Sequence, residues 1–337
     1  MIPLSDTGWQ VQSWQEILAD SVTTVAELTK LLDIEGVPLN AEVDPAFPLF
    51  APRPYLARIE QRNGDDPLLL QILPTNLERA VQPGFSLDPL DERATTLDSG
   101  LMSKYRGRVL ILAAGTCAIN CRFCFRRHFP YDEHKPSKQD WQAIFAFIEG
   151  DESIHEVILS GGDPLVINDQ RLAWVAQRLA AIRHLKRLRI HTRLPIAIPQ
   201  RVCDSLLQWM AATTLQTVLV THCNHPRELD DLVLSSLLRL RQCGVTLLNQ
   251  SVLLKGINDD ADVIVSLSER LFEAGVHPYY LHLLDRVQGA GHFWLSDEEA
   301  QRIYHEAVAR LPGYLLPRLV REVPGARAKM PADGFMI

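Results

Sequence analysis

Three cysteines, Cys117, Cys121 and Cys124, lie close together with the spacing C-x3-C-x2-C, and no fourth cysteine is near. Cysteine thiolates are the usual ligands of iron–sulfur clusters, and a ferredoxin-type run brings four of them, so that every iron is filled. Three thiolates would hold three irons of a [4Fe–4S] cluster and leave the fourth iron open to a small molecule. The spacing therefore predicts a cluster that takes part in catalysis.

Two other uses of these cysteines remain open at this point. Structural zinc normally takes four ligands in two pairs, and here His128 would have to complete a set that lacks its first pair. A disulfide framework is disfavoured by the low density of six cysteines in 337 residues and by the lack of a recognisable secretory signal. The scattered cysteines, Cys203, Cys223 and Cys243, lie among apolar residues and are expected to be buried and reduced.

The composition is that of an enzyme with one large core. The chain has 337 residues, of which 47% are hydrophobic, and a formal net charge of −7. That charge argues against nucleic acid or an anionic membrane as the main partner. No apolar run reaches the roughly 18 residues of a membrane-spanning helix. We expect a cytoplasmic protein in a reducing compartment, which suits an oxygen-sensitive cluster.

The chain changes character after about residue 95. Residues 1–95 hold amphipathic helical stretches, such as 14–32, broken by proline-rich segments, and form a mainly helical appendage. From about residue 107, short runs rich in Val, Ile and Leu alternate with helix-length segments. The expected strands are 109–113, 156–159, 188–191, 217–221, 245–249 and 279–284, and the expected helices are 138–149, 169–183, 200–211, 227–242, 260–274 and 296–310.

This alternation predicts parallel β/α units. Six units make a partial (β/α)6 barrel of the TIM type, an α/β fold, rather than the eight units of a closed barrel. We assign residues 96–312 to this core and 313–337 to a C-terminal segment.

Polar residues follow each expected strand. Active sites of parallel β/α barrels lie on the loops after the strands, so these residues are expected at one rim. In chain order they are the cysteine loop, Gly161-Gly162-Asp163, His191-Thr192-Arg193, His222-Cys223-Asn224-His225, Asn249-Gln250-Ser251 and Asp285.

An open iron needs a ligand that carries an amine and a carboxylate, and S-adenosylmethionine supplies both. Reduction of its sulfonium cleaves a C–S bond and releases a 5′-deoxyadenosyl radical. Gly161 and Gly162 lack a Cβ, so their backbone could approach the methionine ammonium closely. Taken alone, Gly-Gly-Asp-Pro is more typical of an ordinary turn. Phe123, just before the last cysteine, is expected either beside the adenine or in the core.

Together, the cysteine spacing, the Gly-Gly-Asp-Pro loop and the six-unit alternation resemble the radical S-adenosylmethionine superfamily. More narrowly, the chain resembles the lysine 2,3-aminomutase family from about residue 65 to 332. It is most similar to the compact bacterial branch that makes (R)-β-lysine for modifying elongation factor P. The stretches that carry the likeness are Arg106-Gly-Arg-Val-Leu110, Cys121-Arg-Phe-Cys-Phe-Arg-Arg127, Thr192-Arg-Leu-Pro-Ile-Ala-Ile-Pro-Gln-Arg201, Asn224-His-Pro226, Asn249-Gln-Ser-Val-Leu-Leu-Lys-Gly-Ile-Asn258 and Pro324-Gly-Ala-Arg-Ala-Lys329.

The resemblance implies that the protein uses pyridoxal 5′-phosphate together with the [4Fe–4S] cluster and S-adenosylmethionine. Lys329 corresponds to the lysine that holds pyridoxal phosphate as a Schiff base. Arg108 corresponds to a residue near the pyridoxal ring and phosphate, and Gln250 to a ligand on the phosphate side. Asn249 and Ser251, together with His222 and Asn224, are weaker candidates for the same polar pocket. Gly161, Gly162 and Asp163 are assigned to S-adenosylmethionine.

The same resemblance implies L-lysine as the substrate and an external electron donor as a partner. Arg126 corresponds to the residue that grips the substrate carboxylate, whereas Arg122 in the same basic run is expected to be a surface arginine. A buried ammonium needs a carboxylate partner, and Asp285 and Glu322 stand at the two acidic positions of the lysine branch. Glutamate or another amino acid is the alternative substrate, and a metal-stabilised binding module without turnover is the alternative class.

The sequence departs from the family pattern in two places. Glu322 stands where aspartate is more typical, and its extra methylene shifts the carboxylate. The Schiff-base loop is usually a run of glycines, but Ala326, Arg327 and Ala328 replace three of them here, so the loop is expected to take another path. The additional cysteines that some relatives carry near the C-terminus are missing, so no zinc site is expected.

Overall fold

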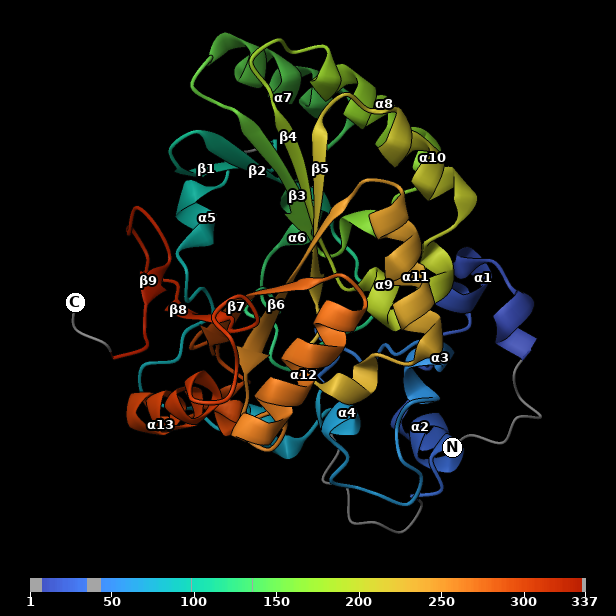
Figure 1. Cartoon of the computed structure of the whole chain (residues 1–337), viewed down its shortest axis with the longest axis vertical. Coiled ribbons are helices and arrows are strands. Elements are labelled where there is room, and N and C mark those ends of the chain that lie inside the picture. The colour runs from blue at the N-terminus through green and yellow to red at the C-terminus, as the bar shows by residue number, and fades with distance from the viewer. Residues whose placement is uncertain (1–7, 35–43, 98, 135, 335–337) are drawn as a thin grey trace.

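A single nine-stranded sheet runs through the computed structural model, which describes residues 8–34, 44–97, 99–134 and 136–334 (Figure 1). The strands lie side by side in chain order, from β1 at one edge to β9 at the other. They are β1 (Leu101–Tyr105), β2 (Arg108–Ala114), β3 (Glu156–Gly161), β4 (Arg187–Thr192), β5 (Gln216–His222), β6 (Thr246–Leu253), β7 (His277–Leu283), β8 (Arg318–Arg321) and β9 (Met330–Pro331).

The partial barrel predicted from the sequence is confirmed. Neighbouring strands from β2 to β8 are all parallel, whereas the edge strands β1 and β9 pair antiparallel with β2 and β8. Within the described ranges β1 and β9 do not pair with each other, so the sheet stays open. The six expected strands are β2 to β7. Strand β8 adds one more parallel strand that the sequence analysis did not anticipate.

One long helix follows each of the strands β2 to β7, and these helices form an arc outside the sheet (Figure 1). Five of them begin at capping side chains: a serine or asparagine precedes α7, α8 and α13, and an aspartate precedes α11 and α12. They match the expected helices, with α10 and α11 starting about four residues later. The helices are α7 (Lys138–Gly150), α8 (Asp169–Ala180), α10 (Asp204–Ala212), α11 (Asp231–Gln242), α12 (Ala261–Glu273) and α13 (Asp297–Val308).

The short elements close turns between these units. Two of them, α6 (Tyr131–His134) and α9 (Leu194–Ala197), are single helical turns. The remaining ones are the 3₁₀ turns η4 (Pro164–Val166), η5 (Pro199–Arg201), η6 (Pro226–Glu228) and η7 (Gly291–Phe293).

The N-terminal appendage packs into the core of the barrel. The expected stretch 14–32 is two helices, because Thr24 caps a new helix after the first one ends at Ala19. Trp14 and Leu28 from this region belong to the same buried cluster as Val157 of β3. The elements here are η2 (Gly8–Val11), α1 (Trp14–Ala19), α2 (Val25–Leu31), α3 (Arg53–Leu56), α4 (Pro67–Leu70), η3 (Asn76–Arg79) and α5 (Glu92–Thr95).

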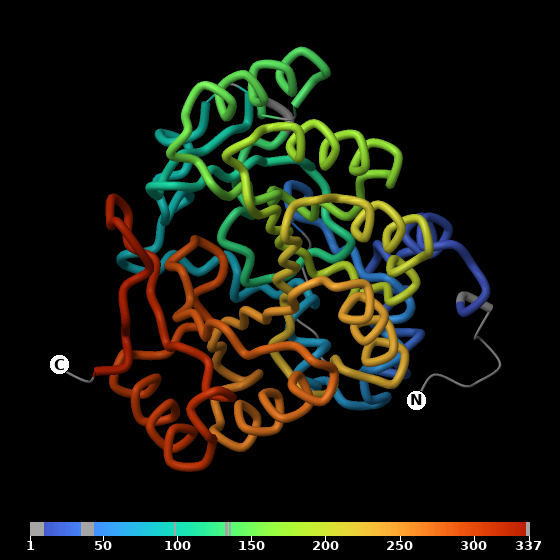
Figure 2. Tube along the Cα trace, turned by 45° about the horizontal axis from the view of Figure 1, so that its top comes forward, coloured from blue at the N-terminus to red at the C-terminus, as the bar shows by residue number. Residues whose placement is uncertain are grey.

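The described part of residues 313–337 extends the sheet. Strand β8 pairs with β7, and β9 folds back on β8, so Lys329 is held at the edge of the barrel. In Figure 2 this C-terminal segment runs alongside the chain around α5 and β1. A hydrogen bond joins the two regions, since the Tyr105 hydroxyl donates to Glu322 Oε1 over 3.1 Å. No helix in the described residues is both long enough and apolar enough to span a membrane.

Candidate active site

A cavity of about 430 Å³ lies inside the open barrel, and strands β1 to β8 all contribute to its wall. The tertiary structure gathers in this one cavity the residues to which the sequence analysis gave a specific role toward the cluster, a cofactor or the substrate. These are Arg108, Cys117, Cys121, Cys124, Arg126, Gly161, Gly162, Asp163, Gln250, Asp285, Glu322 and Lys329.

Strand alternation decides which side chains reach the cavity. Successive residues of a strand point to opposite faces. In β4, Leu188 and Ile190 are buried under the outer helices, while Arg189 and His191 line the cavity. In β6 the same rule sends Gln250 into the cavity.

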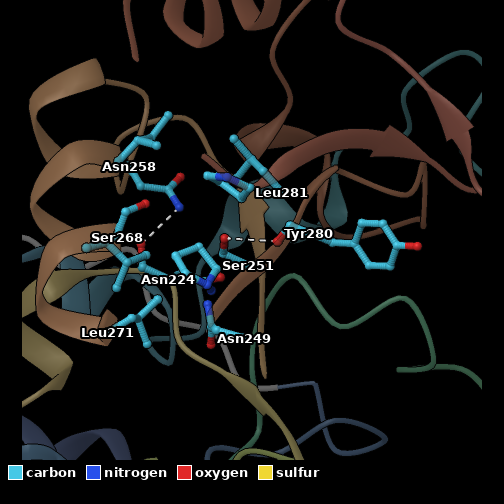
Figure 3. Close-up of a pocket in the computed structure, with 12 residues that line it drawn as sticks. Asn224, Asn249, Ser251, Asn258, Ser268, Leu271, Tyr280 and Leu281 are labelled. Carbon is cyan, nitrogen blue, oxygen red and sulfur yellow. Dashed lines mark hydrogen bonds between the residues drawn. The ribbon is translucent and has the colours of Figure 1, made fainter. Parts of the chain in front are cut away.

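Asn249 and Ser251 therefore face away from the cavity, and the expectation that they share its polar pocket is wrong. The strand β6 runs on to Leu253, so these residues lie within it rather than after it. Both line a hollow of about 10 Å³ together with Ser268 and Leu271 of α12 (Figure 3). The Asn249 amide bonds to both backbone groups of Cys223, over 3.0 Å each. Its role is to join β5 to β6.

The N-terminal appendage holds the cysteine loop from behind. The Arg122 backbone N–H donates to Gln71 O over 2.8 Å. The Arg122 guanidinium, which is fully buried, pairs with both oxygens of Glu78 at 2.7 and 2.5 Å. Arg127 pairs with the same carboxylate. The expectation that Arg122 is a surface arginine is therefore wrong: Arg122 anchors the loop.

The three thiols lie in the cavity wall in an enclosed setting. Burial raises the pKa of Cys117 well above its usual value, and raises the pKa of Cys124 to about 11. Cys121 has a cationic neighbour, because Arg193 Nη1 donates to its Sγ over 2.7 Å. Arg193 is itself buried and pairs with the fully buried Glu228 at 2.8 Å.

This donor set fits an iron–sulfur cluster. Enclosed thiols exchange their protons for a metal, because a bound cation reverses the preference for the neutral form. Within the described chain, no three His, Cys, Asp or Glu side chains converge on the position of a single ion. A [4Fe–4S] cluster does not need such convergence, since each thiolate binds a different iron.

The two glycines allow the loop after β3 to touch the start of the cysteine loop. Gly161 has φ +117°, and a Cβ there would lie 2.4 Å from Ala114 O. A Cβ on Gly162 would lie 2.3 Å from Thr116 O. The N–H groups of Gly162 and Asp163 donate to those same two carbonyls, each over 2.8 Å. Both glycines are thus required for close backbone packing.

The Asp163 carboxylate ties this loop to the loop after β4. It accepts hydrogen bonds from Thr192 Oγ1 at 2.7 Å and from the backbone N–H groups of Arg193 and Leu194 at 2.8 and 3.0 Å. Burial raises the pKa of Asp163, although these donors favour the charged form. Its oxygens are committed to the protein, so its contribution to the site is to hold the two loops together.

The Arg126 guanidinium is buried at one end of the cavity with a carboxylate partner. Its Nε and Nη2 donate to the two oxygens of Glu92 over 2.6 and 3.0 Å, and its Nη1 donates to Ser160 Oγ over 3.0 Å. Glu92 opens helix α5 in the N-terminal appendage. The sequence analysis did not identify this partner.

Acidic residues gather at the Lys329 end of the cavity. The Lys329 ammonium pairs with Glu322 Oε2 at 2.5 Å, and Lys104 Nζ lies 4.0 Å from Glu322 Oε1. Burial, and then the negative charge of Glu322, raise the pKa of Asp285 to about 7. This end of the cavity therefore carries the carboxylates that a substrate ammonium would need.

Three histidines supply neutral imidazoles to the wall. Burial lowers the pKa values of His191 and His282 well below the usual range, and burial and Arg193 lower the pKa of His222 to about 3. In the described part of the chain the Nε2 atom of each is buried without a hydrogen-bond partner. Unpaired buried nitrogens of this kind indicate a wall built to meet a polar ligand, as a phosphorylated or nucleoside cofactor would be.

Several cavity residues were missed from the sequence. Arg189 and His282 occupy alternate positions in β4 and β7, so a search for polar residues at period two within the strands would have found them. Glu92, Lys104 and Tyr105 carry no such signal. They come from α5 and β1, which lie outside the six repeating units.

Comparison with solved structures finds proteins of low identity. One is native anSMEcpe with bound AdoMet and a Cp18Cys peptide, with 12% identity and a TM-score of 0.45 over 59% of this chain and 58% of that one. Another is a radical SAM methyltransferase from Sphaerobacter thermophilus, with 16% identity and a TM-score of 0.43 over 66% and 68%.

Comparison of sequences identifies the family. Residues 106–192 match the family model described as a 4Fe-4S single cluster domain. Three similar proteins are each named L-lysine 2,3-aminomutase. The one from Escherichia coli is 47% identical, covering 96% of this chain and 95% of that protein. The one from Haemophilus influenzae is 48% identical, covering 96% and 97%. The one from Clostridium subterminale is 32% identical, covering 97% and 79%. This chain belongs to the lysine 2,3-aminomutase family.

Proposed function

We propose that the protein is an L-lysine 2,3-aminomutase that converts L-α-lysine to (R)-β-lysine. The observation that carries the proposal is the content of one cavity. It holds the three-cysteine loop, Lys329 and the acids Asp285 and Glu322. The cysteine loop suits radical generation, Lys329 suits a carbonyl cofactor, and the two acids suit a cationic substrate.

Two cofactor sites follow from the residues present. When bound, a cluster with S-adenosylmethionine supplies a 5′-deoxyadenosyl radical, and pyridoxal phosphate supplies a π system that carries the migrating nitrogen. We assign the cluster to Cys117, Cys121 and Cys124, with Arg193 as a donor to the Cys121 sulfur. Lys329 holds the pyridoxal group by its amine.

The phosphate of the pyridoxal group needs cationic and amide donors. Arg108 and Gln250 both line the cavity, and the Arg108 guanidinium stacks on the Tyr105 ring at 4.7 Å. The stacking restricts the rotamers of Arg108 and orders a cation at this wall. We assign the phosphate to these two residues.

The substrate lies between two charged ends. Arg126 meets the lysine carboxylate at one end, and Asp285 and Glu322 meet the side-chain ammonium at the other. Glutamate as the alternative substrate would bring its γ-carboxylate against two acids. That arrangement is disfavoured because two like charges at close range in an enclosed site repel each other strongly.

The physiological setting is proposed from the resemblance. The proteins from E. coli and H. influenzae are matched over nearly their whole length, whereas the clostridial protein is longer than the match. This agrees with the compact branch, whose β-lysine modifies elongation factor P. An external electron donor is required because the reaction begins with a one-electron reduction, and we place the protein in the cytoplasm.

The test is product formation by the reconstituted protein under anaerobic conditions. Iron, sulfide, pyridoxal phosphate, S-adenosylmethionine and a chemical reductant are supplied with L-lysine or with L-glutamate. We expect (R)-β-lysine from lysine and no β-glutamate. Formation of β-glutamate in preference to β-lysine would contradict the substrate assignment, and a loaded enzyme that forms neither product would contradict the proposed function.

A further inference from the structure

Glu92 is a buried acid at the Arg126 end of the cavity. It is 4% exposed and lies in the N-terminal appendage, 34 residues before Arg126 in the chain. Burial acts to raise the pKa of Glu92, but Arg126 and Lys104 outweigh it and hold the pKa below the usual value. Glu92 is therefore a carboxylate at neutral pH.

The two cationic contacts of Glu92 face different parts of the cavity. One carboxylate edge takes the side of the Arg126 guanidinium formed by Nε and Nη2, over 2.6 and 3.0 Å. Lys104 Nζ donates to Oε1 over 3.2 Å. Lys104 also lies 4.0 Å from Glu322, which pairs with Lys329. A chain of alternating charges thus runs from Arg126 to Lys329.

The contact with Glu92 restricts how Arg126 can meet a ligand. A guanidinium has five N–H groups, which form a side edge and a terminal edge, and each edge can grip a carboxylate with two hydrogen bonds. Glu92 occupies the side edge. The terminal edge, formed by Nη1 and Nη2, is then the edge left for a substrate carboxylate. At this edge Nη1 already donates to Ser160 Oγ over 3.0 Å and to Gly161 O over a longer 3.4 Å, a contact that a substrate carboxylate would replace.

We propose that Glu92 is a positioning residue for lysine: it fixes Arg126 so that the substrate carboxylate meets only the terminal edge of the guanidinium. Through Lys104 it also sets the distance from that end to Glu322 at the ammonium end. This inference rests on the proposed function, because it concerns the position that the proposed substrate takes in the cavity. Glu92 itself does not touch the substrate.

The position of the substrate along the cavity matters because hydrogen transfer from one particular carbon needs the reacting atoms in near contact. A displacement of about 1 Å can cost about a hundredfold in rate. If Glu92 were absent, the substrate carboxylate could take the side edge of Arg126, where it would still be bound by charge. Lysine would then bind without a large loss of affinity, but with its reacting carbon displaced.

The experiment removes the Glu92 carboxylate by substitution and then supplies a small carboxylate from solution. We expect Glu92→Ala to lower kcat for lysine by about a hundredfold, with a much smaller change in KM. Added formate or acetate should restore part of the lost kcat, because a small carboxylate can occupy the side edge of Arg126. Chloride at the same ionic strength should not. Glu92→Gln, which keeps the side-chain volume, covers the case in which the alanine variant does not fold.

A matched control separates positioning from stability. Asp169 makes a comparable two-point pair with the fully buried Arg201, at 2.8 and 3.2 Å, outside the cavity. We expect Asp169→Asn to lower the unfolding temperature while kcat per folded, cofactor-loaded protein stays unchanged. A kcat in both Glu92 variants equal to that of the unsubstituted enzyme would overturn the proposal.

A second readout needs no turnover. Acetate should raise the unfolding temperature of Glu92→Ala by more than that of the unsubstituted protein, because only in the variant is the side edge of Arg126 free to bind it. Failure of acetate to stabilise Glu92→Ala or to restore its kcat would overturn the positioning role. A third outcome is that acetate stabilises the variant while the unsubstituted enzyme forms no β-lysine. That result would support the contact of Glu92 with the side edge of Arg126 and would contradict the proposed function.

Discussion

Lys329 Nζ lies 2.5 Å from Glu322 Oε2, and the Tyr105 hydroxyl donates to the other oxygen of the same carboxylate over 3.1 Å. The lysine assigned to pyridoxal phosphate and an acid assigned to the substrate ammonium are therefore direct neighbours. Glu322 is long enough to make this contact from the end of β8. The extra methylene that separates it from the typical aspartate thus places its carboxylate within reach of both Lys329 and Tyr105.

We expect Lys329→Ala to lose pyridoxal phosphate and keep iron, because the amine holds one cofactor and the cysteine loop holds the other. The measurement is an inventory of pyridoxal, iron and sulfide in anaerobically purified protein. The exposed Lys255 supplies a control, and Lys255→Ala should bind both cofactors normally. An alanine variant at 329 that keeps the pyridoxal absorbance would contradict the assignment of this residue.

The rate with lysine should depend on pH through Asp285. Its pKa is raised to about 7, so it is largely protonated below that pH and ionised above it. Because the ionised form attracts the substrate ammonium, kcat/KM for lysine should fall as the pH drops through about 7. The pKa of Glu322 lies below its usual value, because the charges of Lys329 and Lys104 outweigh burial.

The check is a pH profile of kcat/KM from roughly pH 6 to 9 for the unsubstituted enzyme and for Asp285→Asn. The variant should lack the acidic limb and should have a lower plateau, because one attraction for the ammonium is gone. A profile in the variant with the same limb near pH 7 would assign the titration to another group.

Each of Cys117, Cys121 and Cys124 should be needed for the cluster. Replacing any one by alanine should remove most of the iron and the brown absorbance, because two thiolates leave the cluster weakly held. Cys243, at the end of the outer helix α11, provides the matched control, and Cys243→Ala should keep a full iron content. Retention of the cluster in all three site variants would refute the assignment.

Glu78 should be essential to the cysteine loop. Glu78→Gln would leave the buried guanidinium groups of Arg122 and Arg127 without their shared carboxylate. Breaking a buried ion pair of this kind costs about 3 kcal/mol of the free energy of unfolding. Iron uptake should fall as well, because the loop loses its anchor.

The control is Glu306→Gln, which breaks the exposed pair with Arg302 on helix α13. That pair should contribute less than about 0.5 kcal/mol. Urea unfolding measures the free energy of unfolding of the two variants. Equal values would show that the buried Glu78 pair contributes no more to stability than the exposed pair.

Much of this site was visible in the sequence because its signals are local. The spacing of three cysteines within eight residues and the alternation of apolar runs with amphipathic segments depend only on neighbours in the chain. Since parallel strands place their carboxyl ends at one rim, the loops after them could be assigned to one site before any contact was known. Lys329 and Glu322 were reached only through resemblance, because a single lysine or glutamate has no pattern of its own.

The tertiary structure decided what depends on register and on distant partners. Gln250 and Asn249 are adjacent and both polar, yet strand register sends one into the cavity and the other against α12. Arg122 follows a cysteine in a basic run and is nevertheless fully buried, because Glu78 from a separate segment neutralises it. Glu92 reaches Arg126 from the appendage in the same way. A charge can be buried only where the fold brings its counter-charge, and such pairing leaves no periodic trace along the chain.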